Sequence, residues 1–487
     1  MSKNAVTELK PTDLWTRFYE ITQVPRPSKK EEKIREHMRQ LLKKLKTEFK
    51  EDTSGNIVAF VPATSRYENT PTVVIQGHMD MVCEKNKDKV HDFENDPLDV
   101  SIKDGWVIAD GTTLGSDNGI GLAAGLALIT DKDAVHGPLE LLMTVDEETG
   151  LTGANNLEKG FIKGKTLLNL DSEEDGAFYV GCAGGVDTVA AFDITTEAKI
   201  PGSSTYELMV SGLKGGHSGL DIILGRGNAI KILGRVLNAI NNYDFRIASI
   251  EGGSLRNAIP REAEAIIVMK ESDFVKAEKE IKELQVSIQN ELHSVDSGVK
   301  ITFKKSTGTF DQVFTKQFLD KIKNVLLGLP HGVIAMSQDI PGLVETSTNL
   351  ATIKKVDSKL KIATSQRSSV ESAKKYIANN VTAIFKLADG EVELSDGYPG
   401  WKPDMNSRIL KISKKVFYDL FGKEPEIKAI HAGLECGILE GKNPGMDMVS
   451  FGPTIQNAHS PDERVNIETV QKFYDLVKGI LKEIATS

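Results

Sequence analysis

The stretch Thr72-Val-Val-Ile-Gln-Gly-His78-Met-Asp80-Met-Val82 is the one from which the rest of the chain is best interpreted. Its β-branched run predicts a strand that ends near Gly77. Side chains two residues apart on an extended chain point to the same side, so His78 and Asp80 are expected together at the strand's carboxyl end, where open α/β sheets bind ligands. A metal-binding His usually donates its second ring N–H to a carboxylate. On its own, however, a His-x-Asp pair is more often a hydrogen-bonded surface turn.

Length and composition describe an ordinary globular protein. A chain of 487 residues is too long for one core, and two or three domains are expected. The net charge of −9 disfavours nucleic acid or an anionic membrane as the main partner. The three cysteines lie far apart without a CxxC pair, which disfavours a disulfide framework or a thiolate zinc site. No signal-like or membrane-spanning apolar segment is present, so we expect a cytoplasmic protein.

Acidic residues follow several other predicted elements. Gly-Ser-Asp117-Asn-Gly begins a helix rich in small residues, where Asp117 is either a simple N-cap or a ligand. The apolar strand Leu139–Val145 ends in Asp146-Glu147-Glu148, three carboxylates that repel one another unless a positive charge lies among them or the turn is solvated. A further strand at Lys165–Leu170 is followed directly by Asp171.

These strands alternate with helices, which predicts an α/β fold with a mostly parallel sheet flanked by helices. The carboxyl ends of parallel strands meet at one edge of the sheet. We therefore expect His78, Glu147, Glu148 and Asp171 to converge there. One helix of this part is predicted to open with a capping box at Ser28-Lys-Lys-Glu31.

The middle of the chain has a different pattern. Residues 206–303 read as strand–helix–strand–strand–helix–strand, the split βαβ plan, and a similar order recurs over residues 316–394 without its first strand. We predict that residues 187–398 form an inserted α+β lid domain that is internally duplicated. The first domain then consists of residues 1–186 and 399–487.

Five side chains from the first domain make a ligand set for two divalent ions: His78, Asp117, Glu148, Asp171 and His459. Imidazole and carboxylate ligands suit zinc, manganese or cobalt. Three carboxylates and a bridging hydroxide would neutralise two dications, so the cluster could lie in a cleft without a large desolvation cost.

Metal coordination lowers the pKa of bound water to about 7, and a nearby carboxylate that is not a ligand can take its proton. Neighbouring residues on an extended segment point to opposite sides, so Glu147 and Glu148 are expected to have different roles. The pattern alone does not say which of the two is the ligand.

The chain resembles the aminoacylase/carboxypeptidase family of di-zinc metallohydrolases over essentially its full length. The resemblance rests on motifs that occur in the family's order: Gly-His78-Met-Asp80, Gly-Ser-Asp117-Asn-Gly, Asp-Glu147-Glu148-Thr-Gly, Asn-Leu-Asp171, Gly-Gly-His217-Ser-Gly, Gly-Arg-Gly-Asn228-Ala and Ala-His459-Ser-Pro. Together they are far more specific than any one of them.

The resemblance implies a role for each metal-site residue. Asp117 would bridge both metals, with His78 and Asp171 completing one site. Glu148 and His459 would complete the other site. Asp80 would orient His78, and Glu147 would act as the general base and later as the proton donor.

It also implies that the inserted domain contacts the substrate. In this chain those residues would be His217 beside the developing oxyanion, Asn257 or Asn349 as a hydrogen-bond donor, and Arg367 gripping the terminal carboxylate bidentately. Glu435 is a further candidate, for holding the substrate's α-ammonium group. His91, His136, His331 and His431 match no partner and are expected to be structural.

The implied function is a metallo-dipeptidase that uses two divalent ions, first of all Zn²⁺, with Co²⁺ or Mn²⁺ as alternatives. Its substrates would be dipeptides with free termini, including Xaa-His dipeptides such as carnosine. An N-acyl-amino-acid amidohydrolase is the alternative within the enzymes, since it needs no ammonium site. From another class, the alternative is a metal-stabilised binding protein without turnover. Monomer and homodimer both stay open.

Overall fold

The computed structural model describes residues 4–487, and the chain divides into two compact units. Unit 1 contains the chain up to Gly181 together with Pro403–Ala429 and Leu434–Ser487, and unit 2 contains Cys182–Lys402 and Ile430–Gly433. The predicted insertion at 187–398 lies within the first stretch of unit 2. Residues 430–433, which we expected in the first domain, belong instead to unit 2.

Unit 1 is built on an eight-stranded sheet. Its strands are β1 (Glu48–Glu51), β2 (Ile57–Val61), β3 (Val73–His78), β6 (Leu139–Thr144), β7 (Thr166–Asn169), β8 (Ala177–Cys182), β22 (Glu426–Ile430) and β23 (Asp447–Ser450). They lie in the order β1-β2-β6-β3-β7-β23-β8-β22. The neighbours β6, β3, β7 and β23 run parallel, whereas β1, β2 and β8 join antiparallel. The predicted α/β class is confirmed, with the parallel pairing confined to the centre.

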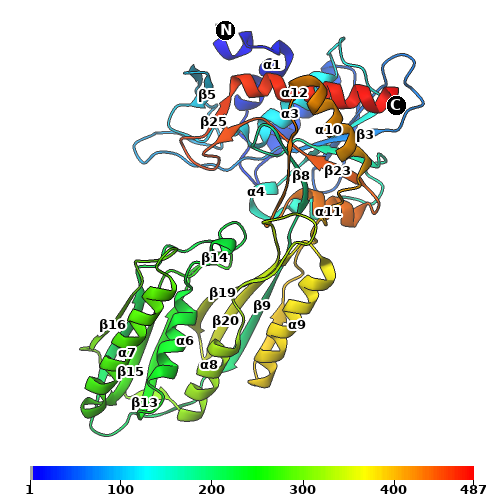
Figure 1. The fold of residues 1–487 in the computed structure, drawn as a ribbon. Coiled ribbons are helices and arrows are strands. Elements are labelled where there is room, and N and C mark those ends of the chain that lie inside the picture. Colours follow the sequence, from blue (N-terminus) through cyan, green and yellow to red (C-terminus); the bar gives the residue numbers. More distant parts are fainter. Residues whose placement is uncertain (1–3) are drawn as a thin grey trace. The chain divides into compact units, whose positions relative to one another are not determined.

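The helices of unit 1 are η1 (Ala5–Glu8), α1 (Thr12–Thr22), α2 (Glu32–Lys44), α3 (Ser116–Leu128), α4 (Glu147–Gly150), α5 (Thr152–Asn155), α10 (Arg408–Phe421), α11 (Glu435–Lys442) and α12 (Ile467–Thr486). α3 packs against β3 and α1, and α10 packs against β23 and α12 (Figure 1). A separate sheet contains β4 (Val100–Lys103), β5 (Trp106–Ala109), β24 (Ile455–Gln456) and β25 (Arg464–Asn466).

Small residues let α3 approach the central strands closely. Every residue of β3 and β6 is buried, as apolar strands in the centre of a covered sheet must be. A Cβ added to Gly77 would collide with the Asn118 side chain, and one added to Gly121 would collide with the Leu170 carbonyl. The start of α3 therefore lies directly beside the carboxyl ends of β3 and β7.

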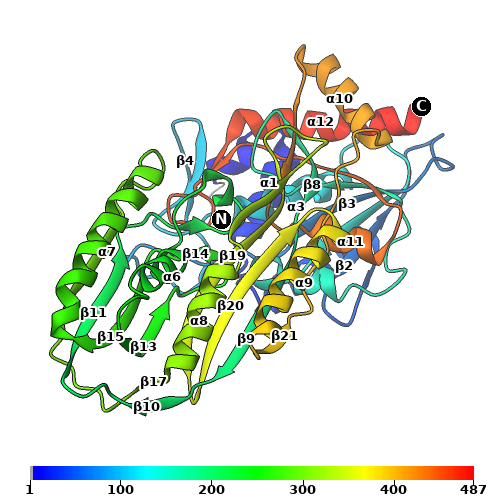
Figure 2. The same ribbon diagram turned by 60° about the horizontal axis from the view of Figure 1, so that its bottom comes forward.

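Unit 2 contains a nine-stranded sheet in which all the recorded pairings are antiparallel. Its main strands are β9 (Gly184–Asp193), β11 (Ser203–Ser211), β13 (Phe245–Gly252), β15 (Ala263–Lys270), β16 (Lys300–Lys305), β18 (Gly332–Met336), β19 (Val344–Val356), β20 (Lys359–Ser368) and β21 (Glu391–Leu394). Shorter elements are β10 (Thr196–Ala198), β12 (Gly216–His217), η2 (Ile222–Leu224), β14 (Ala258–Ile259) and β17 (Gln312–Phe314). The helices α6 (Ala229–Ala239), α7 (Glu271–Glu291), α8 (Lys316–Gly328) and α9 (Glu371–Leu387) form a layer over the sheet (Figures 1 and 2).

The two halves of this sheet have the same topology. In one half, the strands lie in the order β16-β11-β15-β13. Counted along the chain, these are the fourth, first, third and second strands of that half. The other half, β21-β9-β20-β19, has the same order when β9 is taken as its first strand. From the sequence, the second copy lacked a first strand. In the structure β9 is that strand, and it was not assigned to the second copy because it precedes the first copy in the chain. The shared order supports the predicted internal duplication.

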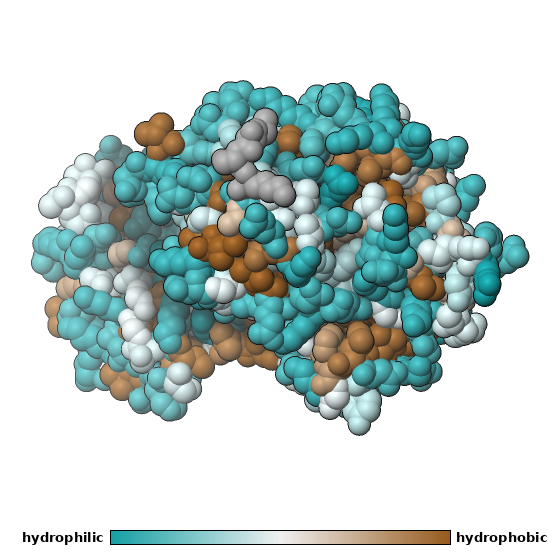
Figure 3. Space-filling model, turned by 90° about the horizontal axis from the view of Figure 1, so that it is seen from above, coloured by the Kyte–Doolittle hydropathy of each residue, from teal (hydrophilic) through white to brown (hydrophobic). Residues whose placement is uncertain are grey.

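None of the helices described in residues 4–487 combines the length and the apolar character that crossing a membrane requires. On the face drawn in Figure 3, hydrophobic side chains lie in separate groups among hydrophilic ones. Isolated apolar groups of this kind are normal for a protein surface.

A substitution in β19 tests the seam between the two halves of unit 2. Leu350 is 0% exposed in the core of this unit, so Leu350→Ala should lower the free energy of unfolding by about 2–5 kcal/mol. Leu387→Ala is the matched control, because Leu387 on α9 is 87% exposed and its loss should change stability by about 0.5 kcal/mol or less. Urea unfolding followed by circular dichroism measures both; equal effects would contradict the assigned core.

Candidate metal centre

Three adjacent parallel strands bring predicted ligands to one edge of unit 1. His78 is the last residue of β3, Glu148 lies on α4 just after β6, and Asp171 follows β7. The strands lie in the order β6-β3-β7, so their carboxyl ends open on the same side. The sheet itself thus produces the convergence that the sequence predicts.

The donor atoms form two groups that share Asp117. In each group, His78–Asp117–Asp171 and Asp117–Glu148–His459, the atoms lie within 4.8 Å of one another. His78 Nε2 is 3.1 Å from Asp117 Oδ1, and His459 Nε2 is 3.2 Å from Asp117 Oδ2. The two oxygens of one carboxylate therefore face two different histidines, which is the arrangement of a bridging ligand.

The outer ligands complete each group at similar distances. Asp171 Oδ1 lies 3.3 Å from His78 Nε2, and Glu148 Oε2 lies 3.1 Å from His459 Nε2. Asp117 is thus not a simple N-cap; the N-cap of α3 is Gly115, and the backbone at Asp117 is non-helical.

Asp80 lies on the other side of the His78 ring, with Oδ1 3.3 Å from Nδ1. It is fully buried and accepts hydrogen bonds from the backbone N–H groups of Glu147 (3.0 Å) and Glu148 (3.2 Å). Burial opposes its charge, but the hydrogen bond from His78, the charge of that ring, and the hydrogen bonds from the Glu147 N–H and the Ser28 hydroxyl hold the pKa of Asp80 down at about 2. Asp80 therefore orients the ring and also fixes the backbone of both glutamates.

The donor set fits divalent cations. Hydrogen bonds to Asp117 and Glu148 raise the pKa of His459 to about 11, and burial raises the pKa of Asp171 to about 7. Burial opposes a charge on His78, yet Asp171 and the other neighbouring carboxylates raise its pKa well above the ordinary value. The raised pKa values of the two histidines show that the neighbouring carboxylates favour a positive charge at this place. Among the described residues, Glu148 Oε1 is buried without a hydrogen-bond partner, as a free ligand atom would be.

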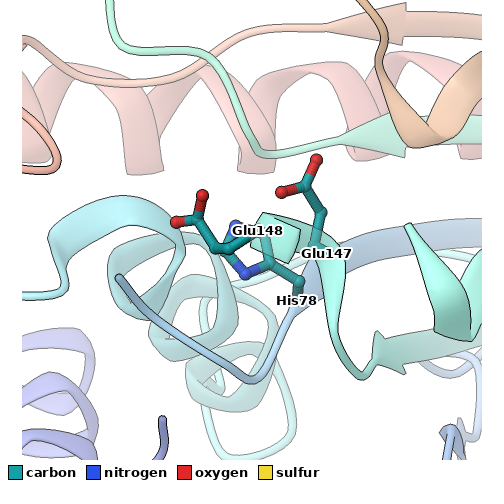
Figure 4. A group of neighbouring side chains, drawn as sticks. All are labelled: His78, Glu147 and Glu148. Atoms are coloured by element: carbon teal, nitrogen blue, oxygen red, sulfur yellow. The ribbon is translucent and has the colours of Figure 1, made fainter. Parts of the chain in front are cut away.

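Glu147 and Glu148 lie on the helical turn α4, so the extended segment that we assumed from the sequence is wrong. Their carboxylates nevertheless diverge from adjacent positions beside the His78 ring (Figure 4). Glu147 lies near His78 and Glu148, but it belongs to neither group that contains Asp117. Its desolvation and the nearby Asp171, Glu435 and Glu148 carboxylates raise the pKa of Glu147 well above the ordinary value, against the effect of His78.

The predicted capping box is wrong, and its residues serve the centre instead. α2 begins at Glu32 without a side-chain cap. Ser28 Oγ donates to Asp80 Oδ2 at 2.8 Å, and Glu31 Oε1 accepts from the N–H of Asp146 at 3.0 Å. A Ser-x-x-Glu pattern fits both uses, so the sequence carries no signal that separates them.

The substrate-binding candidates of the inserted domain lie together within unit 2. His217 is on β12, which pairs with β14, and the N–H of Ser218 donates to the Asn257 carbonyl at 2.8 Å. Asn349 on β19 donates from Nδ2 to the Ala258 carbonyl at 2.8 Å, while its buried Oδ1 has no hydrogen-bond partner in the part of the chain that the structure describes. Both asparagines are thus close to the His217 segment.

Arg367 belongs to the same region of unit 2. It is 7% exposed and donates from Nη1 to the Tyr398 hydroxyl at 2.8 Å, and its buried Nε has no hydrogen-bond partner within residues 4–487. Burial, with the nearby Arg367 charge, lowers the pKa of His217 and brings that of His431 to about 3. His431 Nε2 lies 2.7 Å from Ser347 Oγ. His431, which we expected to be purely structural, therefore lies near the substrate-binding candidates.

Glu435 lies in unit 1 at the start of α11 and is 0% exposed. Oε2 accepts from Thr144 Oγ1 at 2.7 Å and from Gln76, whereas no described residue forms a hydrogen bond with Oε1. Burial raises the pKa of Glu435 to about 8. Its suggested role as the ammonium ligand stays a prediction.

Comparison with known proteins adds independent findings. The family model described as "Peptidase family M20/M25/M40" matches residues 74–483. The chain is 41% identical over 480 residues to the cytosol non-specific dipeptidase of Escherichia coli (strain K12), covering 98% of this chain and 99% of that protein. The crystal structure of aminoacylhistidine dipeptidase from Vibrio alginolyticus matches with a TM-score of 0.92 at 41% identity, covering 98% of both chains. Aminopeptidase PepT from Bacillus cereus, at a TM-score of 0.57 and 18% identity, shares the fold.

Metal analysis tests the shared carboxylate. If Asp117 serves both groups, Asp117→Asn should reduce bound Zn²⁺ from about two ions per chain to less than one, whereas Asp171→Asn should leave about one. Asp110→Asn is the control, because that side chain is 71% exposed outside both groups. Atomic emission after dialysis against Zn²⁺ gives the ratio, and an Asp117→Asn protein with the metal content of the control would contradict the bridging arrangement.

Proposed function

Because the chain belongs to peptidase family M20/M25/M40, we propose that it is a metal-dependent dipeptidase that hydrolyses dipeptides with free termini. One observation carries the proposal: two donor groups share the Asp117 carboxylate, and Glu147 lies beside them as a carboxylate outside both groups. This is the arrangement needed for two divalent ions and a separate proton carrier.

The names of the relatives support the substrate class. The E. coli relative is called a non-specific dipeptidase, and the V. alginolyticus structure is called an aminoacylhistidine dipeptidase. What the two names share is the dipeptide, so we assign dipeptides broadly and include Xaa-His dipeptides of the carnosine type among them. The E. coli relative is also named as cytosolic, which supports the cytoplasm as the site of action.

We assign two divalent ions to the centre. His78 and Asp171 would hold one ion, Glu148 and His459 the other, and Asp117 both. Imidazole with carboxylate favours Zn²⁺, and Co²⁺ or Mn²⁺ suit the same donors. When bound, the ions polarise the substrate carbonyl and lower the pKa of water.

Glu147 moves the proton in this mechanism. Its raised pKa lets the carboxylate take a proton from the attacking water and then give it to the nitrogen of the leaving amine. Asp80 holds the N–H groups of Glu147 and Glu148, so it keeps the base and the neighbouring ligand in fixed directions. Proton transfer then needs no rearrangement of α4.

Unit 2 supplies groups that suit the ends of a small substrate. Arg367, with its unpartnered Nε, is assigned to the terminal carboxylate, because a guanidinium matches a carboxylate bidentately. His217 and either Asn257 or Asn349 are assigned to the carbonyl oxygen, and Glu435 of unit 1 to the α-ammonium group.

A hydrolysis panel tests the proposal as a whole. The purified protein should release both amino acids from free dipeptides, including Xaa-His dipeptides, and should lose this activity in chelator and regain it with Zn²⁺. N-acetylated amino acids and N-acetylated dipeptides should be poor substrates. Preferred cleavage of the acetylated compounds would instead support an amidohydrolase, and metal binding without turnover would support a binding protein.

Replacement of the proposed base gives a sharper test. Glu147→Gln should lower kcat by about 10²–10⁴-fold with little change in bound metal, because the amide cannot accept the proton. Glu158→Gln is the control. It makes the same glutamate-to-glutamine change in an exposed contact with Thr53, and it should retain full activity. Unchanged turnover in Glu147→Gln would show that the assigned base is wrong.

The Arg367 assignment is tested by a conservative change. Arg367→Lys should raise KM for free dipeptides about tenfold or more, since lysine cannot bind a carboxylate bidentately. Arg256→Lys, whose side chain is 73% exposed, should leave KM unchanged. C-terminally amidated dipeptides already lack the carboxylate, so the wild type and Arg367→Lys should process them alike; an equal KM rise on amides would contradict the assignment.

A further inference from the structure

A buried arginine connects two of the ligand-bearing segments. Arg26 is 1% exposed, and its Nη1 donates to the carbonyl oxygens of Met79 (3.1 Å) and Asp80 (2.7 Å). Its Nη2 donates to the carbonyl oxygen of Gly115. The guanidinium therefore ties the loop after β3, next to His78, to the start of α3, next to Asp117.

A buried glutamate connects the same start of α3 to the loop that carries His459. Glu463 is 3% exposed and lies four residues after His459. Its Oε2 accepts from the N–H groups of Leu114 (2.8 Å) and Gly115 (2.9 Å). Its Oε1 accepts from both the N–H (2.7 Å) and the hydroxyl (2.6 Å) of Ser116. One carboxylate thus satisfies the donors of the segment that leads directly into Asp117.

The two side chains bind the same residue, Gly115, from its two backbone polar groups. Arg26 binds the carbonyl of Gly115, and Glu463 binds its N–H. Gly115 has φ +65°, and a Cβ there would collide with the Arg26 guanidinium. Among charged groups, Glu463 has the largest favourable effect on the Arg26 charge. The pair is therefore complementary in charge as well as in hydrogen bonding.

Burying two charges is costly unless each is well solvated by the protein. Here every recorded hydrogen bond of both side chains goes to segments next to proposed metal ligands. A pair that only stabilised the fold would have no reason to be placed this way. Hydrogen-bond partners around metal ligands commonly change metal affinity by about 10–100-fold when removed.

We infer that Arg26 and Glu463 are positioning residues that hold the Asp117 carboxylate between the two histidines, and that Glu463 acts chiefly on the group containing His459. The inference rests on the proposed metal ligands and goes beyond them. His78 and Asp171 are held by strands β3 and β7, whereas the His459 side chain is 51% exposed on a loop. Glu463 is the group that fixes this loop against α3.

The test compares Glu463→Gln with Glu140→Gln. Both oxygens of Glu463 accept hydrogen bonds, and glutamine replaces one of them with an amide group that only donates. That group faces backbone N–H donors, so the hydrogen bonds of at least one of the two oxygens are lost. Glu140 is the matched control, because it is 2% exposed and also accepts two backbone N–H groups, those of Lys163 (2.8 Å) and Gly164 (2.9 Å). Both proteins are titrated with Zn²⁺ against a chromophoric chelator, and with Co²⁺ while the visible spectrum is recorded.

Glu463→Gln should weaken one of the two binding steps by about tenfold or more and leave the other within about threefold. The Co²⁺ spectrum should lose the contribution of one site, and kcat should fall more than KM rises. Glu140→Gln should keep both binding steps even where its thermal midpoint falls. Two binding steps in Glu463→Gln that match those of Glu140→Gln would overturn the inference, as would an equal loss of both steps.

Ser116→Ala keeps the inference testable if Glu463→Gln does not fold. It removes only the hydroxyl donor to Glu463, and should weaken the same binding step to a smaller extent. Unaltered metal binding in Ser116→Ala would then count against the inference. Failure of the proposed function is a separate result, because it would be seen in the wild type as absence of metal binding or of dipeptide hydrolysis.

Discussion

The concentration of carboxylates at one edge of a parallel sheet is the constraint on which the rest of the structure depends. Two histidines, His78 and His459, lie close to the carboxylates of Asp117, Glu148 and Asp171. Two more carboxylates, those of Asp80 and Glu147, lie next to His78. So many acidic groups repel one another unless positive charge lies among them. The neighbouring carboxylates raise the pKa values of His78 and His459, whereas burial is the largest cause of the raised pKa values of Glu147 and Asp171.

The backbone around these carboxylates is held by close packing and by hydrogen bonds between backbone N–H groups and buried carboxylates. Close packing of α3 on β3 depends on glycine at positions where any side chain would collide, such as Gly77 and Gly121. Backbone N–H groups are then available to the buried carboxylates, two of them to Asp80 and three strong ones to Glu463. The packed backbone thus fixes the positions of the buried carboxylates, and these determine the directions of the proposed ligands.

The parts predictable from the sequence are those that depend on short patterns. The apolar strands ending at His78, before Glu147 and before Asp171 gave both the α/β class and the convergence of the site, because parallel strands necessarily share an edge. One failure is local, since Glu147 and Glu148 lie on a helical turn and not on an extended segment. The other failures involve partners distant in the chain. Ser28 and Glu31 fit a helix cap locally, but Asp80 and Asp146 compete for them in the folded chain. The strand β9 is separated from its repeat by the whole first copy, and His431 reaches Ser347 only through the tertiary fold.

The two ligand groups also differ in how firmly their histidines are held. The His78 side chain is 1% exposed at the end of a central strand, and Asp80 fixes its second ring nitrogen. The His459 side chain is 51% exposed, and it lies on a loop with a left-handed backbone at φ 62°. The shared Asp117 carboxylate thus joins a group held by the sheet to a group whose histidine lies on a loop. If both groups bind divalent ions, the central strands would position the ligands of one ion, and the contact between Glu463 and the start of α3 would position the histidine of the other.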